Sequence, residues 1–218
     1  MLPKKLYKLK KRKSFLNRGI ILLFLIFFGS EISLAQDFMA GVKAGVAASQ
    51  ISGDKLSGFN KAGIVAGAFI HNRIKPNFSV GLELLYTQKG SRKNSNPSDG
   101  DFDSYLLRLN YIEMPVLLKY LQSNTFTFEL GPGVAYLLHE YEEDQNGELP
   151  NRESFNKMEW FAHIAMHYHF HPQISIQTRG SYSFLPVRPH KGNSTLYFNK
   201  GQYNTVISIS LNYHFNRN

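Results

Sequence analysis

The strongest constraint on this chain is an alternation of polarity with a period of two residues, repeated in runs of eleven to fifteen residues. The run at residues 203–215 is the clearest: its odd positions are mostly aromatic or aliphatic, and its even positions are mostly Asn, Ser and His, with Val206 the one exception. Successive side chains of a β-strand point to opposite faces. Alternation of this length therefore indicates a strand with one apolar and one polar face.

Eight such runs follow one another, at residues 38–48, 61–71, 78–89, 106–120, 125–138, 158–170, 174–184 and 203–215. The breaks between them alternate in length, with long polar segments at 49–60, 90–104, 140–155 and 187–201 and short ones at 72–77, 122–124 and 171–173. Long loops at one end, short turns at the other and an even number of strands are typical of bacterial outer-membrane barrels. The sequence thus predicts an all-β fold, an eight-stranded antiparallel up-and-down transmembrane β-barrel.

Period two alone also fits a soluble, lipocalin-like barrel with an apolar pocket and a polar exterior. Three features favour the membrane. The polar face is rich in Ser, Thr, Gly and Asn rather than in Lys and Glu, aromatic residues gather near the strand ends, and the last strand closes with Tyr213-His214-Phe215. We therefore expect location in the outer membrane.

The run 106–120 carries charge at both parities, since Arg108 and Asn110 alternate out of phase with Glu113 and Lys119. A β-bulge between Asn110 and Pro115 would return these four side chains to one face, and a bulge also tolerates a proline. With that bulge, the outward apolar face is predicted to consist of Leu107, Leu109, Ile112, Met114, Val116, Leu118 and Tyr120.

Residues 1–35 have the composition of a signal peptide, with a basic start, a short apolar run at 20–28 and the small residues Ser33 and Ala35 before the expected cleavage site. The alternative is a membrane anchor helix, but the apolar run is about half of the roughly 20 residues that such a helix needs. The predicted division is a signal peptide at 1–35 and a barrel domain at 36–218.

Removal of this segment changes the charge balance. Eight of the 25 basic residues and one of the 16 acidic residues lie within it, which leaves 17 against 15. The mature chain is thus nearly neutral, and nothing in its charge favours nucleic-acid binding. Because there is no cysteine, disulfides, thiolate metal sites and thiol nucleophiles are excluded.

The interior of an eight-stranded barrel is just wide enough to be filled by side chains. The charged residues that we assign to this lumen are Lys43, Glu83, Lys89, Arg108, Glu113, Lys119, Glu129, Glu159 and Arg179. Buried charges persist only when they are paired and hydrogen-bonded. Five positive and four negative residues therefore predict an interlocked ladder that plugs the barrel. The alternative is a narrow channel for ions or small solutes, in which several of these charges would stand unpaired around water.

Four segments together resemble the PorT-like outer-membrane β-barrel domain family: 41–45 (Gly-Val-Lys-Ala-Gly), 83–90 (Glu-Leu-Leu-Tyr-Thr-Gln-Lys-Gly), 111–120 (Tyr-Ile-Glu-Met-Pro-Val-Leu-Leu-Lys-Tyr) and 131–133 (Gly-Pro-Gly). Their order and spacing cover nearly all of residues 37–215. The run at 179–183 keeps the family's arginine and aromatic residue but lacks its Gly-Leu-x-Asn. The resemblance implies the barrel fold and the outer membrane, and the namesake of the family takes part in type IX protein secretion.

Other patterns suggest chemistry more weakly. His163, His167, His169 and His171 share one face and could bind zinc or copper, but no carboxylate completes the set nearby, so polar lining is the preferred interpretation. The acidic segments 99–103 and 140–148 do not follow calcium-loop spacing. His139 and several serines near a strand end form no recognisable catalytic set.

We therefore expect no cofactor, no metal and no catalysis. The predicted role is structural or partner-binding, with membrane lipid and an envelope or secretion protein as partners and no nucleic acid, in a barrel that is monomeric.

Overall fold

The computed structural model describes residues 38–54, 56, 58–149, 153–189 and 201–215. The signal peptide expected at 1–35 lies outside these ranges and stays a prediction. Among the described residues, no helix is long and apolar enough to cross a membrane.

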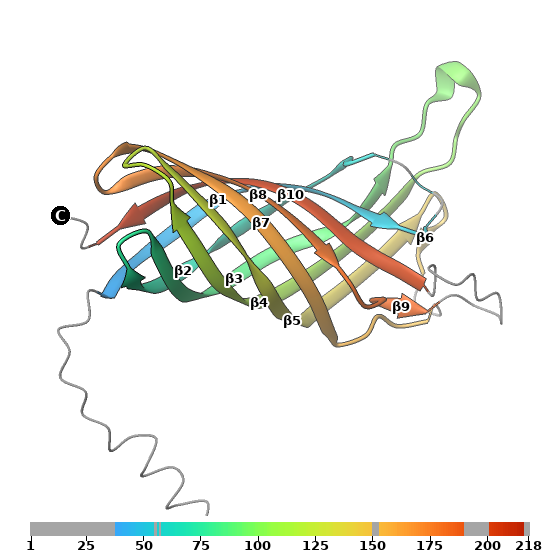
Figure 1. Ribbon diagram of the computed structural model, residues 1–218. Helices are drawn as coiled ribbons and strands as arrows, with labels where there is room; N and C mark the ends of the chain where they lie inside the picture. The colour runs from blue at the N-terminus through green and yellow to red at the C-terminus, as the bar shows by residue number, and fades with distance from the viewer. Residues whose placement is uncertain (1–37, 55, 57, 150–152, 190–200, 216–218) are drawn as a thin grey trace, which may run out of the picture. The chain divides into compact units, whose positions relative to one another are not determined.

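Eight long antiparallel strands form a closed barrel, which confirms the predicted fold class (Figure 1). They are β1 (Phe38–Ser52), β2 (Lys61–Lys75), β3 (Phe78–Lys93), β4 (Tyr105–Leu121), β5 (Phe126–Asp144), β7 (Met158–His171), β8 (Ile174–Ser183) and β10 (Gly201–His214). Each pairs with the next long strand along the chain, and β1 pairs with β10 to close the barrel. The short strands β6 (Gly147–Glu148) and β9 (Arg188–Pro189) pair with β5 and β10, and a short 3-10 helix, η1 (Pro97–Asp99), lies between β3 and β4.

Long connections leave one end of the barrel, which we call the loop end, and short turns leave the other, the turn end. Five strands run further toward the loop end than predicted: β1, β3 and β5 continue to Ser52, Lys93 and Asp144, and β4 and β10 begin at Tyr105 and Gly201. These polar extensions are paired across the sheet; Lys93 and Asp144, for example, both lie opposite Tyr105. Backbone N–H and C=O groups need hydrogen-bond partners whether the side chain is polar or apolar. Strand ends predicted from side-chain polarity therefore lie short of the strand ends in the structure.

The predicted bulge in β4 is wrong. β4 alternates without interruption, and the irregularity lies in its neighbour: Asn110 pairs with His139 and Tyr111 with Leu137, which leaves Leu138 as the extra residue on β5. Leu107 and Leu109 consequently face the interior, both with 0% of their surface exposed, while Arg108 points outward and is exposed.

The interior is layered along the barrel axis rather than polar throughout. Near the loop end it holds an apolar cluster of Ile51, Leu107, Leu109, Tyr111, Ala135, Leu137, Phe155, Phe161 and Val187. Phe155 and Val187 follow β5 and β8 in the chain and join this cluster at the barrel mouth. The charged residues lie below this cluster, and histidines gather toward the turn end.

The outer surface is apolar, as a lipid-facing wall requires. Ile164 on β7 is 71% exposed, and Leu84, Leu130 and Ile209 are also well exposed. Aromatic pairs lie near both ends, with Phe78 against Tyr120 and Phe126 against Tyr168 at the turn end. A soluble protein rarely exposes a continuous apolar patch of this extent. The lipocalin-like alternative, which required an apolar interior and a polar exterior, is therefore wrong.

Candidate functional site

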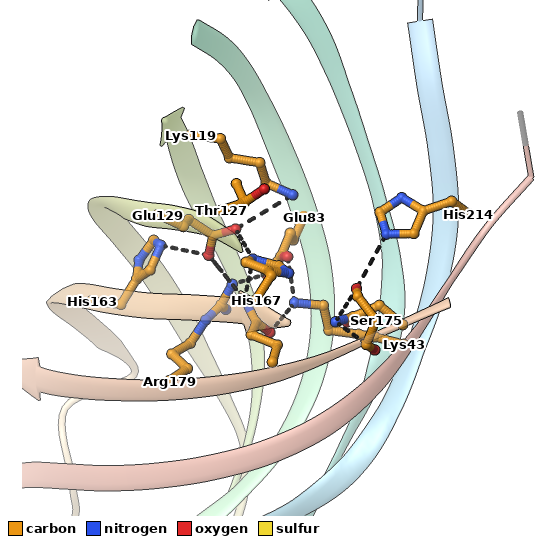
Figure 2. A network of polar contacts seen from close by, with 12 residues as sticks. Lys43, Glu83, Lys119, Thr127, Glu129, His163, His167, Ser175, Arg179 and His214 are labelled. Atoms are coloured by element: carbon orange, nitrogen blue, oxygen red, sulfur yellow. Dashed lines mark hydrogen bonds and ion pairs between the residues drawn. The ribbon is translucent and has the colours of Figure 1, made fainter. Parts of the chain in front are cut away.

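The centre of the lumen is an ion-pair network built around one arginine, as Figure 2 shows. The Arg179 guanidinium on β8 places Nη2 2.6 Å from Glu83 Oε2 and 2.6 Å from Glu129 Oε1. Lys43 on β1 forms a further ion pair with Glu83. Lys119 Nζ lies 3.4 Å from Glu129 Oε2. Five strands thus contribute one charge each, and every one of these side chains is buried.

Strand register explains why these charges meet. Lys119 on β4 and Glu129 on β5 are directly opposite in the ladder and point to the same face. Glu83 on β3 shares their inward parity, and Arg179 reaches both carboxylates from β8. Because side chains alternate along each strand, inward charges from all strands converge in the narrow lumen.

A second cluster surrounds Lys89, closer to the loop end. Its Nζ lies 2.7 Å from Glu113 Oε1 and 2.8 Å from Glu159 Oε1, above the rings of Tyr111 and Phe161. Two other side chains also bind Glu159: the Ser183 hydroxyl and the Asn204 amide donate to it at 2.7 and 2.9 Å. This ammonium is therefore paired twice and sits directly beneath the apolar cluster.

Histidines border the network on both sides, with His163 on the loop side of Glu129 and His167 on its turn side. His163 Nε2 and His167 Nε2 lie 3.2 and 3.0 Å from the two oxygens of Glu129. His169 contacts the Thr127 hydroxyl at 3.0 Å, and the His171 ring accepts from the Gln173 backbone N–H. Within the described ranges, no three His, Asp or Glu side chains are placed so that they could hold a metal ion.

Sequence reasoning did not single out His71 and His214, which complete the histidine group at the turn end. Their ring centroids are 6.2 Å apart, and His214 lies 5.8 Å from His169. The three line a cavity of about 40 Å³ together with His167, Lys119 and Thr127. His71 and His214 both have inward parity, so the alternation on β2 and β10 could have placed them in the lumen.

Eight of the nine residues assigned to the lumen are buried inside the barrel, four positive and four negative. Arg108 is the exception, because the continuous register of β4 turns it outward. Gln177 joins the central network, since it accepts from Lys43 at 2.7 Å and donates to Glu129 at 3.1 Å. The alternation along β8 places Gln177 on the inward face, but the lumen residues predicted from the sequence were charged residues only.

The acidic residues at the loop end are partly engaged by cations. Glu142 Oε2 lies 2.8 Å from Arg188 Nη1, and the Arg188 guanidinium stacks on the Phe155 ring at 4.1 Å. Lys93 Nζ lies 2.9 Å from Asp101 Oδ2, and its hydrogen bond lowers the pKa of the exposed Asp101 carboxyl. Tyr105 donates a hydrogen bond to Glu142 at 2.7 Å. These contacts fasten the loops to the barrel rim.

Comparisons with known proteins agree with this geometry. A family model described as outer membrane protein beta-barrel domain matches residues 34–187. Among solved structures, Neisserial surface protein A is similar with a TM-score of 0.51 at 14% identity, covering 81% of this chain and 97% of that one. Ail of Yersinia pestis, in complex with the heparin analogue sucrose octasulfate, gives 0.50 at 13% identity over 82% and 99%. At such identities the similarity shows the fold alone. No curated protein matches the sequence.

Proposed function

The chain belongs to the outer membrane protein beta-barrel domain family and is located in the outer membrane, and from this premise we propose that it works as a closed barrel that binds a partner at its loop end. It is neither a channel nor an enzyme in this proposal.

The pairing of the lumen charges carries the proposal. Four positive and four negative buried side chains contact one another, with Arg179 shared between Glu83 and Glu129 and Lys89 between Glu113 and Glu159. A conducting pore needs polar or charged groups that stay available to a passing ion. In this lumen each charged group is already attracted to an oppositely charged side chain, so it is less available to a passing ion.

The apolar cluster adds a second barrier in series. Leu107 and Leu109 face inward directly above the charged layers, and Phe155 and Val187 cover them from the loop side. An ion entering from the turn end would have to break buried ion pairs and then cross a layer lined mostly by apolar side chains, which is costly.

Single-channel conductance of the refolded mature protein in a planar bilayer tests the closed lumen. Glu113→Gln and Arg179→Gln alter the two charge clusters separately, and Arg108→Gln is the matched control because it removes one arginine charge from the outside. We expect no current from the wild type or from the control. Reproducible wild-type current that shifts in Glu113→Gln but not in Arg108→Gln would favour the channel alternative.

The loop end offers the binding surface. The connection between β3 and β4 carries Phe102, which is 70% exposed, flanked by Asp101 and Asp103. An exposed aromatic ring among carboxylates suits a partner that has an apolar pocket with a basic rim. The resemblance of residues 111–120 to the PorT-like family supports a protein-secretion component as that partner.

Site-specific photo-crosslinking in outer membranes tests the partner. A photoreactive residue at Phe102 is expected to give one discrete adduct, identified by mass spectrometry as an envelope or secretion protein. The matched position is Gln145, at the tip between β5 and β6, where we expect no such adduct. Identical products at both positions would indicate collision rather than binding and would count against the loop surface.

A further inference from the structure

The cavity of about 40 Å³ at the turn end of the lumen has a polar lining that comes from β2, β3, β4, β5, β7 and β10. Strand register brings these side chains together: Ser79 pairs with both Arg73 and Lys119, and His71 lies two residues before Arg73 on the same face of β2. The cavity opens at the turn end, where its lining includes the exposed Arg73 and Pro76. We call it the turn-end cavity.

The polar groups on this lining are all able to donate hydrogen bonds. They are the ammonium of Lys119, the guanidinium of Arg73, the hydroxyls of Ser79 and Thr127, and the imidazoles of His71, His167, His169 and His214. Among the described residues, no carboxylate lines the cavity. Lysine and arginine donate and never accept, whereas a neutral imidazole does one of each. The lining therefore has an excess of donors, which suits a ligand rich in acceptors.

The ion pairs of the lumen leave positive charge beside this cavity. The central network contains three cations and two carboxylates, namely Lys43, Lys119, Arg179, Glu83 and Glu129. The compensating negative charge lies in the second cluster, closer to the loop end. Of the five central residues only Lys119 lines the turn-end cavity, and its ammonium lies 3.4 Å from Glu129, further than the 2.6 Å contacts of Arg179 (Figure 2). The least neutralised cation of the network thus faces the cavity.

A second observation on the same lining also indicates a missing acceptor. His71 is 7% exposed, and neither of its ring nitrogens has a hydrogen-bond partner among the described residues. Two of its neighbours on the lining are engaged, since His169 contacts the Thr127 hydroxyl and His214 contacts the Ser175 hydroxyl. A buried donor without a partner is unfavourable. An acceptor in the cavity would remove this cost at His71.

The size and surroundings of the cavity limit what the ligand can be. One water needs roughly 10–15 Å³ of such space, so the cavity has room for about three waters or one small oxyanion. Donors reach it from several sides of the barrel, which suits a tetrahedral anion whose oxygens point in several directions. A metal cation is unsuited, because Lys119 and Arg73 would repel it and because no three His, Asp or Glu side chains in the described ranges are placed to hold one.

We infer that the turn-end cavity binds an oxyanion of the phosphate class, with His71 as a hydrogen-bond donor and with Lys119 and Arg73 as its counter-charges. Hydrogen bonds to an ionised acceptor are roughly twice as strong as neutral ones, so an anion satisfies this lining better than water does. Short turns in this class of barrel face the periplasm. The anion therefore enters from that side and reaches the cavity without passing the ion-pair network.

The test uses the refolded mature protein in dodecyl maltoside micelles, whose head groups contain no phosphate. The thermal unfolding midpoint is measured as sodium phosphate is added, with sodium chloride at the same ionic strength as the reference for general salt effects. Two variants alter the site: His71→Phe keeps a ring and removes its nitrogens, and Arg73→Gln removes the charge at the mouth. Lys75→Gln is the matched control, because Lys75 is exposed on the same strand but lies opposite the outward-facing Phe78.

We expect phosphate to raise the midpoint of the wild type and of Lys75→Gln above the value in chloride, because a ligand that binds the folded state stabilises it. The apparent affinity for phosphate should fall by about tenfold or more in His71→Phe, which loses a hydrogen bond to a charged group. In Arg73→Gln it should fall by about fivefold or less, because this arginine is exposed. Since Arg73→Gln leaves the buried residues unchanged, its response tests the site even if His71→Phe folds poorly.

The phosphate can be a soluble ion or the head group of a lipid, and micelles that contain phosphatidylglycerol without added phosphate separate the two sources. An increase in these micelles that His71→Phe abolishes would assign the site to a head group.

Three results would overturn the inference. They are equal midpoints in phosphate and chloride, an undiminished phosphate response in both His71→Phe and Arg73→Gln, and an increase with zinc chloride but not with sodium phosphate. The turn-end cavity lies at the opposite end of the barrel from the loop surface, so none of these results depends on a partner bound there.

Discussion

His71 is a buried lumen residue whose polar atoms lack partners. It is 7% exposed, and neither of its ring nitrogens has a hydrogen-bond partner among the described residues. Its neighbours include the Phe69 ring, stacked at a centroid distance of 6.0 Å. A buried polar group without a partner costs about 1–3 kcal/mol, so this position carries a cost that an apolar ring would avoid.

We therefore predict that His71→Phe raises the free energy of unfolding by about 1–3 kcal/mol, since the ring is kept and the unpartnered nitrogens are removed. Urea titration of the barrel in lipid vesicles measures this change. His139→Phe, on the exposed rim at the loop end, serves as the control and should change stability by less than about 0.5 kcal/mol. A loss of stability in His71→Phe would mean that water or a ligand in the 40 Å³ cavity satisfies the histidine.

At the scale of the element, β5 shows how a glycine makes room inside a filled barrel. A Cβ added at Gly133 would lie 2.4 Å from the Phe161 ring of the neighbouring strand β7. Phe161 is fully buried and belongs to the apolar cluster. The small residue on β5 and the large one on β7 are therefore complementary in volume.

This complementarity predicts that Gly133→Ala destabilises the barrel by about 1–3 kcal/mol through overpacking. Phe161→Leu should recover part of that loss in the double variant, and a double-mutant cycle measures the coupling between the two sites. Additive effects of the two substitutions would show that the glycine serves the backbone rather than the packing of Phe161.

At the scale of the whole molecule, the position of the barrel in the bilayer follows from its outer wall. Ile164 lies midway along β7 between Trp160 and Tyr168, whereas Asn110 lies one row nearer the loop end than the row of Tyr86, Ile112 and Tyr136. Both side chains point outward, so a charge at either position leaves the lumen untouched.

Ile164→Arg is predicted to destabilise the protein in lipid vesicles by about 2–4 kcal/mol, because arginine near the midplane is costly, and Asn110→Arg by about 0–1 kcal/mol near the interface. Urea titration of the two variants compares these depths directly. Equal losses at both positions would contradict the placement of the membrane.

The sequence by itself determined the number of strands, their order, the alternation of long and short connections and the membrane as surroundings. These features are local, because the polarity of each residue and its parity within a strand can be read without knowing its neighbours in space. The same parity placed Lys43, Glu83, Glu129, Glu159 and Arg179 inside the barrel.

Tertiary structure alone decided how these groups combine. The extra residue is Leu138 on β5 rather than a residue of β4, so Leu107 and Leu109 entered the lumen and Arg108 left it. Glu83 and Glu129 share Arg179 because the barrel closes and brings β8 across from β3 and β5. Register and closure depend on contacts between distant segments, and a pattern of period two shifts to the opposite face when a single residue is inserted.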